Sequence, residues 1–223
     1  MLKCPLPSLL VAASLGSSLL FAPAGCDEPQ EEAQRTASTS AESTSDLLTG
    51  RKSQVRIDTS ALDSPPDDPT SLTVLGLTAP KPATWIWQPP KRTMRKANFT
   101  VPGRDGEDQA ELVINHFPEA PGNTLDANLS RWSKQFRTID GGNPKPLIST
   151  LDADSMPVTI VELHGEYMGM GGHWHKTDHR MLMAVIDAPV GTVFIKLLGP
   201  DDTVEANRAH YMSMITGMKQ AAQ

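Results

Sequence analysis

Hydrophobic and polar residues alternate along the C-terminal two thirds of the chain in a way that predicts a set of strands. Met94–Pro102 and Ala110–Phe117 alternate as half-buried strands do, and the turn-forming stretch GRDGEDQ separates them. Four further strands are predicted from the stretches PLISTLD, PVTIVELHGEYM, HRMLMAVIDA and GTVFIKLLG, with a turn at APVGT before the last one.

Two helices are predicted from apolar residues that recur at helical spacing. The first spans Leu125–Ile139, with Thr124 or Asp126 as its cap and Gly141–Gly142 as its end. Its apolar positions are Leu125, Leu129, Trp132, Phe136 and Ile139. The second begins after Pro200, and its buried stripe is Val204, Tyr211, Ile215 and Met218, with the stem of Arg208 alongside.

The last two strands, within His179–Ala188 and Gly191–Gly199, are apolar at nearly every position. A strand of this kind needs cover on both faces, which predicts a central place in the sheet. Short turns between consecutive strands favour antiparallel pairing. The pattern therefore predicts an α+β fold, with a twisted antiparallel β-sheet flanked by two main helices in one domain over residues 72–223.

Residues 26–71 have a different composition, rich in Ser, Thr, Pro and acidic residues and poor in aromatic ones. Such a segment buries too little apolar surface to offset its ordering entropy, so it is predicted to be a disordered tether. Between Asp27 and Thr70 there are ten acidic and four basic residues, which leaves the rest of the chain almost neutral. With no basic excess on the folded part, we expect no nucleic-acid partner.

The N-terminus reads as a signal peptide over residues 1–25. Leu9–Phe21 is an apolar run of the length of a signal-peptide core and is too short to span a bilayer. The following FAPAGC resembles the lipobox of bacterial lipoproteins, although Pro23 stands where that family usually has an aliphatic residue. This resemblance implies lipidation of Cys26 and a membrane anchor in the cell envelope, facing the periplasm.

An alternative use of the same residues remains open. Ala22 and Ala24 form an A-x-A cleavage site, and cleavage after Ala24 would release a secreted soluble protein. The cysteine usage favours the anchor, because the chain has only two cysteines and Cys4 leaves with the signal peptide. A lone remaining thiol in an oxidising compartment would be a liability.

Three stretches, in this order, resemble a PsbP-like family of uncharacterised bacterial envelope lipoproteins. They are ATWIWQPPKRTMRKANFTVP, NLSRWSKQF (Asn128–Phe136) and GTVFIKLLGPDDTVEANRAHYMSMI (Gly191–Ile215), and the resemblance spans roughly Ala83–Lys219. It implies an α-β-α sandwich and, usually, no known catalysis.

The mature chain carries no signature of a common enzyme class: no G-x-S-x-G elbow, no H-E-x-x-H, no glycine-rich phosphate loop and no cysteine nucleophile. We therefore predict no catalytic residues, and we expect a non-catalytic accessory or interaction module with an unknown envelope protein as partner. Within the helix motif, Arg131 and Gln135 lie one turn apart and are candidate interaction residues. The alternative is that Arg131 pairs with a sheet carboxylate while Trp132 anchors the helix.

The stretch MGMGGHWHKTDHRMLM (Met168–Met183) suggests a different function, periplasmic copper or zinc binding. A hairpin in which paired residue numbers sum to about 351 places Met168 opposite Met183 and Met170 opposite Met181. The candidate ligands are His173, His175, His179, Met168 and Met170. The alternative is that these methionines are core residues, the histidines face water and the protein needs no cofactor.

Glu162, His164 and Glu166 alternate along a predicted strand and so share one face. A histidine between two carboxylates suits a general base or a metal ligand. The alternative is a polar strand face near a sheet edge or under the rim of a helix.

Overall fold

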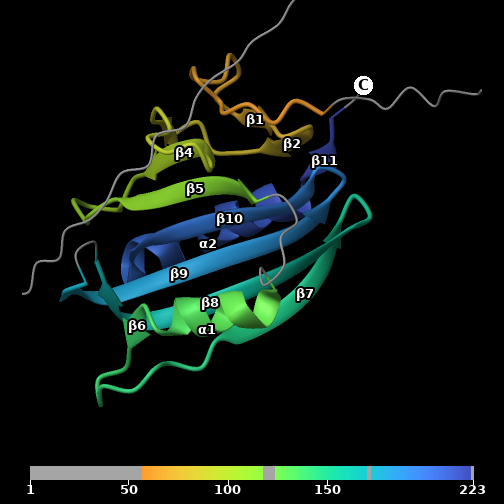
Figure 1. The fold of residues 1–223 in the computed structure, drawn as a ribbon. Helices are drawn as coiled ribbons and strands as arrows, with labels where there is room; N and C mark the ends of the chain where they lie inside the picture. Colours follow the sequence, from red (N-terminus) through yellow and green to blue (C-terminus); the bar gives the residue numbers. More distant parts are fainter. Residues whose placement is uncertain (1–56, 118–123, 170–171, 222–223) are drawn as a thin grey trace, which may run out of the picture. The chain divides into compact units, whose positions relative to one another are not determined.

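The computed structural model describes residues 57–117, 124–169 and 172–221. Its main sheet has eight strands, and all of its pairings are antiparallel (Figure 1). The order along the sheet is β3 (Ile86–Trp87), β4 (Arg95–Val101), β5 (Ala110–Phe117), β10 (Gly191–Pro200), β9 (Trp174–Ala188), β8 (Met156–Met168) and β6 (Phe136–Arg137), and β7 (Leu147–Ala153) pairs with β8 beside β6.

A second, three-stranded sheet was not predicted from the sequence. It joins β1 (Ser71–Val74), β2 (Leu77–Pro80) and β11 (Lys219–Gln220), which come from the two ends of the described chain. Leu75 and Gly76 form the two-residue turn between β1 and β2, both at positive φ (57° and 68°). This combination suits a tight hairpin. The strands are too short for a periodic signal, which is why the sequence pattern did not reveal them.

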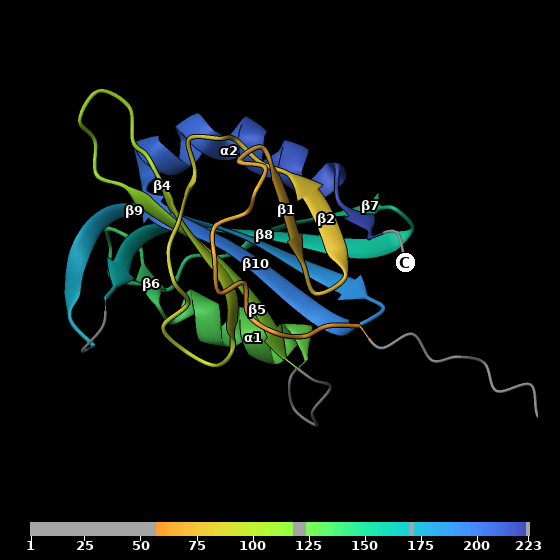
Figure 2. The same cartoon turned by 90° about the horizontal axis from the view of Figure 1, so that it is seen from above.

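Two helices lie on opposite faces of the main sheet: α1 (Leu125–Ser133) and α2 (Asp201–Thr216) (Figure 2). On β9, Leu182, Ala184 and Ile186 share a core with α2, whereas the alternate residues Met181 and Met183 share a second cluster with Trp132 of α1. The alternation of strand side chains therefore supplies both cores.

The predicted α+β class and the central place of the last two strands are confirmed. β10 lies between β5 and β9, and β9 lies between β10 and β8. Three residues of the predicted α2 stripe, Val204, Tyr211 and Ile215, are buried on the helix, whereas Met218 is buried just after the helix ends at Thr216. The Tyr211 hydroxyl donates to the Ile195 carbonyl at 2.8 Å.

The first helix is shorter than predicted. Thr124 caps its start, accepting from the Ala127 amide at 3.2 Å, but α1 ends at Ser133 and not near Gly141–Gly142. Phe136 belongs to β6, which pairs with β8, and Ile139 is fully exposed, at 108 %. The helical spacing of apolar residues continues past Ser133 because Phe136, a buried residue of β6, happens to lie four residues after Trp132.

The predicted register of the β8–β9 hairpin is wrong. Met183 pairs with Val161, Met181 pairs with Leu163, and Met168 lies opposite Trp174. Pairs that sum to about 351 would centre the turn between His175 and Lys176. The Gly172 amide instead donates to the Gly169 carbonyl, which closes the turn in the glycine-rich stretch. Met181 and Met183 are therefore core residues, as the alternative reading expected.

Residues 57–70, the described part of the chain before β1, contact the domain although they form no strand. The Leu62 amide donates to the Lys96 carbonyl at 2.7 Å, and the Leu62 side chain packs on the main core. Trp85 is buried, and its indole donates to Asn207 of α2 at 3.1 Å, while Trp87 donates to the Leu62 carbonyl at 3.3 Å. Both tryptophans therefore serve packing.

Cys26 and Met170 lie outside the described residues. Among the helices of the described part, neither is both long and apolar enough to cross a bilayer.

Candidate functional site

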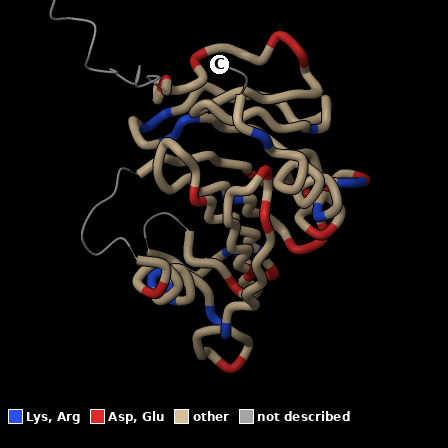
Figure 3. The backbone as a smooth tube through the Cα atoms, turned by 90° about the vertical axis from the view of Figure 1, so that its right-hand side faces the viewer, with Lys and Arg blue, Asp and Glu red and all other residues tan. Residues whose placement is uncertain are grey.

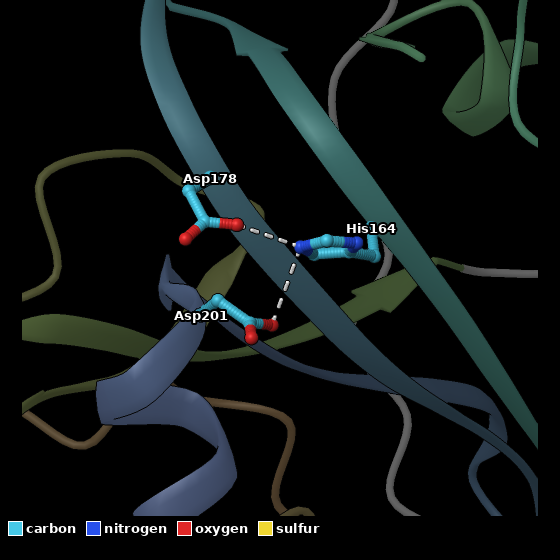
Figure 4. Close-up of side chains that lie close together, drawn as sticks. All are labelled: His164, Asp178 and Asp201. Atoms are coloured by element: carbon cyan, nitrogen blue, oxygen red, sulfur yellow. Dashed lines mark hydrogen bonds and ion pairs between the residues drawn. The ribbon is translucent and has the colours of Figure 1, made fainter. Parts of the chain in front are cut away.

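Three side chains with metal-binding and acid–base chemistry meet where β8, β9 and the start of α2 come together (Figure 4). His164 Nε2 lies 2.9 Å from Asp178 Oδ1 and 3.5 Å from Asp201 Oδ1. One ligand atom from each residue falls within 4.8 Å of the other two. The His164 side chain is 47 % exposed and that of Asp178 is 72 % exposed, so the cluster is open to solvent.

An irregularity in the β8–β9 pairing brings Asp178 to this position. Gly165 pairs with His179 and Tyr167 with Lys176, so β9 carries one residue more than β8 between these pairs. Asp178 takes a left-handed backbone conformation there, with φ of 52°. Aspartate is among the residues that tolerate this region best, and bulges of this kind redirect side chains.

A network of ion pairs holds the rest of the cluster. Arg180 Nε donates to Asp201 Oδ1 at 2.5 Å, and the Arg180 guanidinium also contacts Glu162. Arg208 of α2 binds Glu162 with both terminal nitrogens, at 2.7 and 3.0 Å, and binds Glu205 at 2.8 Å. Glu162 thus ties β8 to α2, while Arg180 ties β9 to the first residue of the helix.

These contacts keep the inner carboxylates ionised. Burial disfavours the charge on Glu162, but hydrogen bonds and charge from Arg208 and Arg180 outweigh it, and the pKa of Glu162 lies below its ordinary value. Burial likewise opposes ionisation of Asp201, and Arg180 again lowers the pKa. The pKa of Arg208 is raised, chiefly by its hydrogen bond to Glu162.

Two hollows adjoin the cluster, and Asp178 lines both. One, of about 860 Å³, lies between the Thr138–Gly141 loop and His164. The other, of about 950 Å³, is lined by His175, Lys176 and His179 together with six acidic residues: Asp105, Glu107, Asp108, Asp178, Asp201 and Asp202. Elsewhere acidic and basic residues are interspersed along the described chain (Figure 3).

The histidines of the hairpin do not converge with one another. His175 Nδ1 contacts the His173 carbonyl, and His179 Nδ1 contacts the Thr177 carbonyl. The His179 ring stacks on the Tyr167 ring, with the ring centroids 6.3 Å apart. Burial is the main reason that the pKa of His179 is lowered. Met168 is half-buried at the end of β8. In the part of the chain that the structure describes, His164, Asp178 and Asp201 form the group of His and carboxylate ligand atoms that converge.

Arg131 and Gln135 lie on and just after α1. The Arg131 guanidinium bonds Asn128 within the helix, which is a different partner from the sheet carboxylate that the alternative expected. Gln135 accepts the Met168 amide through its backbone carbonyl at 2.8 Å. Trp132 anchors the helix as expected, at 6 % exposure, and packs edge-to-face on Phe194 with ring centroids 6.1 Å apart.

The strand face predicted to carry Glu162, His164 and Glu166 divides into two sites. Glu162 lies under α2, whereas Glu166 binds Arg137 of β6 at 2.5 Å. Gly165 separates them, with φ of 149°, and a Cβ there would lie 2.4 Å from the Arg137 carbonyl oxygen. Only a glycine lets β6 approach β8 this closely beside His164.

Sequence reasoning singled out His164 and Glu162 but missed their partners. Asp178 was visible as an aspartate amid histidines, and Asp201 as an acidic residue at a helix start, where it favours the helix dipole. Arg180 had no signal of its own, and Arg208 was noted only for its stem beside the buried stripe of the second helix. The partners lie 14 to 46 residues from His164 or Glu162 in sequence, so no local spacing pattern joins them.

No protein-family model and no curated protein matches the chain. Among solved structures, it is similar to a Pseudomonas aeruginosa protein of unknown function, PA94, with 10 % identity, a TM-score of 0.39, and 53 % of this chain and 78 % of that chain covered. It is also similar to LpqN of Mycobacterium tuberculosis, a protein involved in cell envelope biogenesis, with 11 % identity, a TM-score of 0.41, and 64 % and 82 % covered. Likenesses with TM-scores below 0.5 carry no argument about family or function.

Proposed function

We propose that this chain is a lipid-anchored accessory protein of the bacterial cell envelope, and that its α+β domain binds a partner protein and catalyses no reaction. A PsbP-like arrangement is part of the proposal. The position of α1 and α2 on opposite faces of one antiparallel sheet supports it, as do the three sequence stretches that resemble that family.

The observation that carries the non-catalytic assignment is the pairing of the inner carboxylates with arginines. A general acid or base works best with a pKa near the operating pH. The pKa values of Glu162 and Asp201 move away from neutrality instead. Within the described residues, the side-chain partners of His164 are Asp178 and Asp201, so no Ser, Thr or Cys is hydrogen-bonded to it as a nucleophile would be.

The lipid anchor rests on the sequence and has a direct test. Mass spectrometry of the mature protein from a host that processes lipoproteins should find an N-terminal peptide that starts at Cys26 and carries the mass of a diacylglycerol. A Cys26→Ser variant should lack this mass and remain unprocessed, because the thiol is the site of attachment. A mature chain that starts at Gly25 with an unmodified thiol would contradict the anchor and support cleavage after Ala24.

We place the partner at the second of the two hollows, which is lined by six acidic residues and is called the acidic hollow below. Six carboxylates against Lys176 and two histidines give it a negative potential, which attracts a basic segment and speeds encounter. The expected partner is therefore an envelope protein with a cationic segment.

A photo-crosslinking side chain at Gln109, on the rim of this hollow, should capture one envelope protein in intact cells. The same photo-crosslinking side chain at exposed Asp187 is the matched control. Asp187 lies near the C-terminal end of β9, about 30 Å along the strand from the β9 residues that line the hollow. We expect the Gln109 product to weaken at high salt. Equal products from both positions, or none from Gln109, would count against a partner at the hollow.

A further inference from the structure

The arrangement of His164, Asp178 and Asp201 matches the dimensions of a zinc site. Zinc bonds to imidazole nitrogen and carboxylate oxygen are about 2.0–2.2 Å, so neighbouring ligand atoms in a tetrahedral site lie about 3.3 Å apart. The two distances from His164 Nε2, 2.9 and 3.5 Å, bracket this value. The third, between the two aspartates, is no more than 4.8 Å. Small side-chain rotations would complete the triangle.

The surrounding charges favour a divalent cation. Asp201, Glu162 and Glu205 pair with the guanidinium groups of Arg180 and Arg208, and a fourth carboxylate, that of Asp178, pairs with His164. With His164 neutral, the cluster carries a net charge of −2, which one divalent cation neutralises. Arg180 also holds Asp201 Oδ1, the atom that faces His164, as outer-shell hydrogen bonds commonly orient a ligand carboxylate.

The donor set decides between metals. One imidazole and two carboxylates suit zinc and similar borderline divalent ions, whereas calcium and magnesium prefer oxygen alone. Copper(I) prefers sulfur, and the buried Met181 and Met183 lie on the opposite face of the sheet. The hollows on either side of Asp178 leave room for water as the remaining ligand.

We propose that His164, Asp178 and Asp201 bind one zinc ion, or a similar divalent transition-metal ion, with water completing the coordination. This site differs from the hairpin site expected from the sequence and goes beyond the proposed accessory role. Because two of the three protein ligands are solvent-exposed, we expect zinc to bind with micromolar affinity and no tighter. The ion would join β8, β9 and α2 at the edge of the acidic hollow.

Zinc binding to the full chain, without a polyhistidine tag and with its thiols alkylated, tests the proposal by calorimetric titration at neutral pH. We expect one zinc ion per chain. Asp178→Asn and His164→Gln should each weaken binding by about 10-fold or more, and together they should abolish it. Both side chains are exposed, so these variants should fold, and their unchanged melting temperature without zinc verifies this. Zinc should raise the melting temperature of the parent chain and should leave that of the Asp178→Asn, His164→Gln double variant unchanged.

The matched control is the double variant His173→Ala with His175→Ala, which removes two exposed imidazoles from the hairpin. It should bind zinc as the parent does. If the parent chain binds no zinc at a zinc concentration of about 100 μM, the proposal is overturned. It is also overturned if the Asp178→Asn, His164→Gln double variant binds zinc as tightly as the parent chain does. Loss of binding in the hairpin variant would also overturn it and would assign the ion to the hairpin.

Discussion

Replacing Trp132 with alanine is expected to destabilise the domain by about 3–5 kcal/mol, the range for removing a large aromatic side chain from a packed core. Trp132 is the buried anchor of α1, and it packs on Phe194 of a central strand. The cluster under α1 contains few residues, so the cavity cannot be filled easily by neighbours. Chemical denaturation, with the free energy of unfolding extrapolated to water, measures the loss.

Ile139→Ala is the matched control for this prediction. The sequence pattern placed Ile139 on the same buried stripe as Trp132, whereas the structure leaves it fully exposed. Its replacement should change stability by less than about 0.5 kcal/mol. A large loss of stability from Ile139→Ala would support the longer helix that the sequence predicts. A small loss of stability from Trp132→Ala would contradict the packing of α1 on the sheet.

Glu162→Gln is expected to cost about 2–3 kcal/mol near neutral pH, because it leaves Arg180 and Arg208 without their shared carboxylate. Removing one partner of a fully buried ion pair costs about 3–5 kcal/mol. The lower figure here allows for solvent screening, since the guanidinium groups are partly exposed while the Glu162 side chain is 14 % exposed. Glutamine keeps the shape and removes the charge, so the loss reports electrostatics and not packing.

The control for this variant is Glu205→Gln, which removes an exposed i,i+3 partner of Arg208 and should cost no more than about 0.5 kcal/mol. Acidification gives a second check. Because the folded-state pKa of Glu162 is lowered, its contribution is full above the unfolded pKa and is lost as pH falls through the folded pKa. The stability difference between the parent chain and Glu162→Gln should therefore shrink in acid. A constant difference would argue against the ion pairs.

The strands of the main sheet differ in how well the sequence predicts them. Strands such as β5 and β10 were placed almost to the residue, because alternating or continuous apolar runs bounded by turn residues leave little choice. β6 was taken for the end of a helix, since two residues are too few to have a period. The hairpin register was wrong because a glycine-rich turn and a bulge set it, and neither is specified by side-chain alternation.

The sequence by itself determined the α+β class, the central strands and the burial of Trp132 and Tyr211. These depend on local pattern and on the free energy of burying apolar side chains. Only the tertiary structure decided that His164 meets Asp178 and Asp201, and that Arg180 and Arg208 hold Glu162 between a strand and a helix. Charged contacts of this kind depend on where the folded backbone brings distant residues together, and no periodicity in the chain records that.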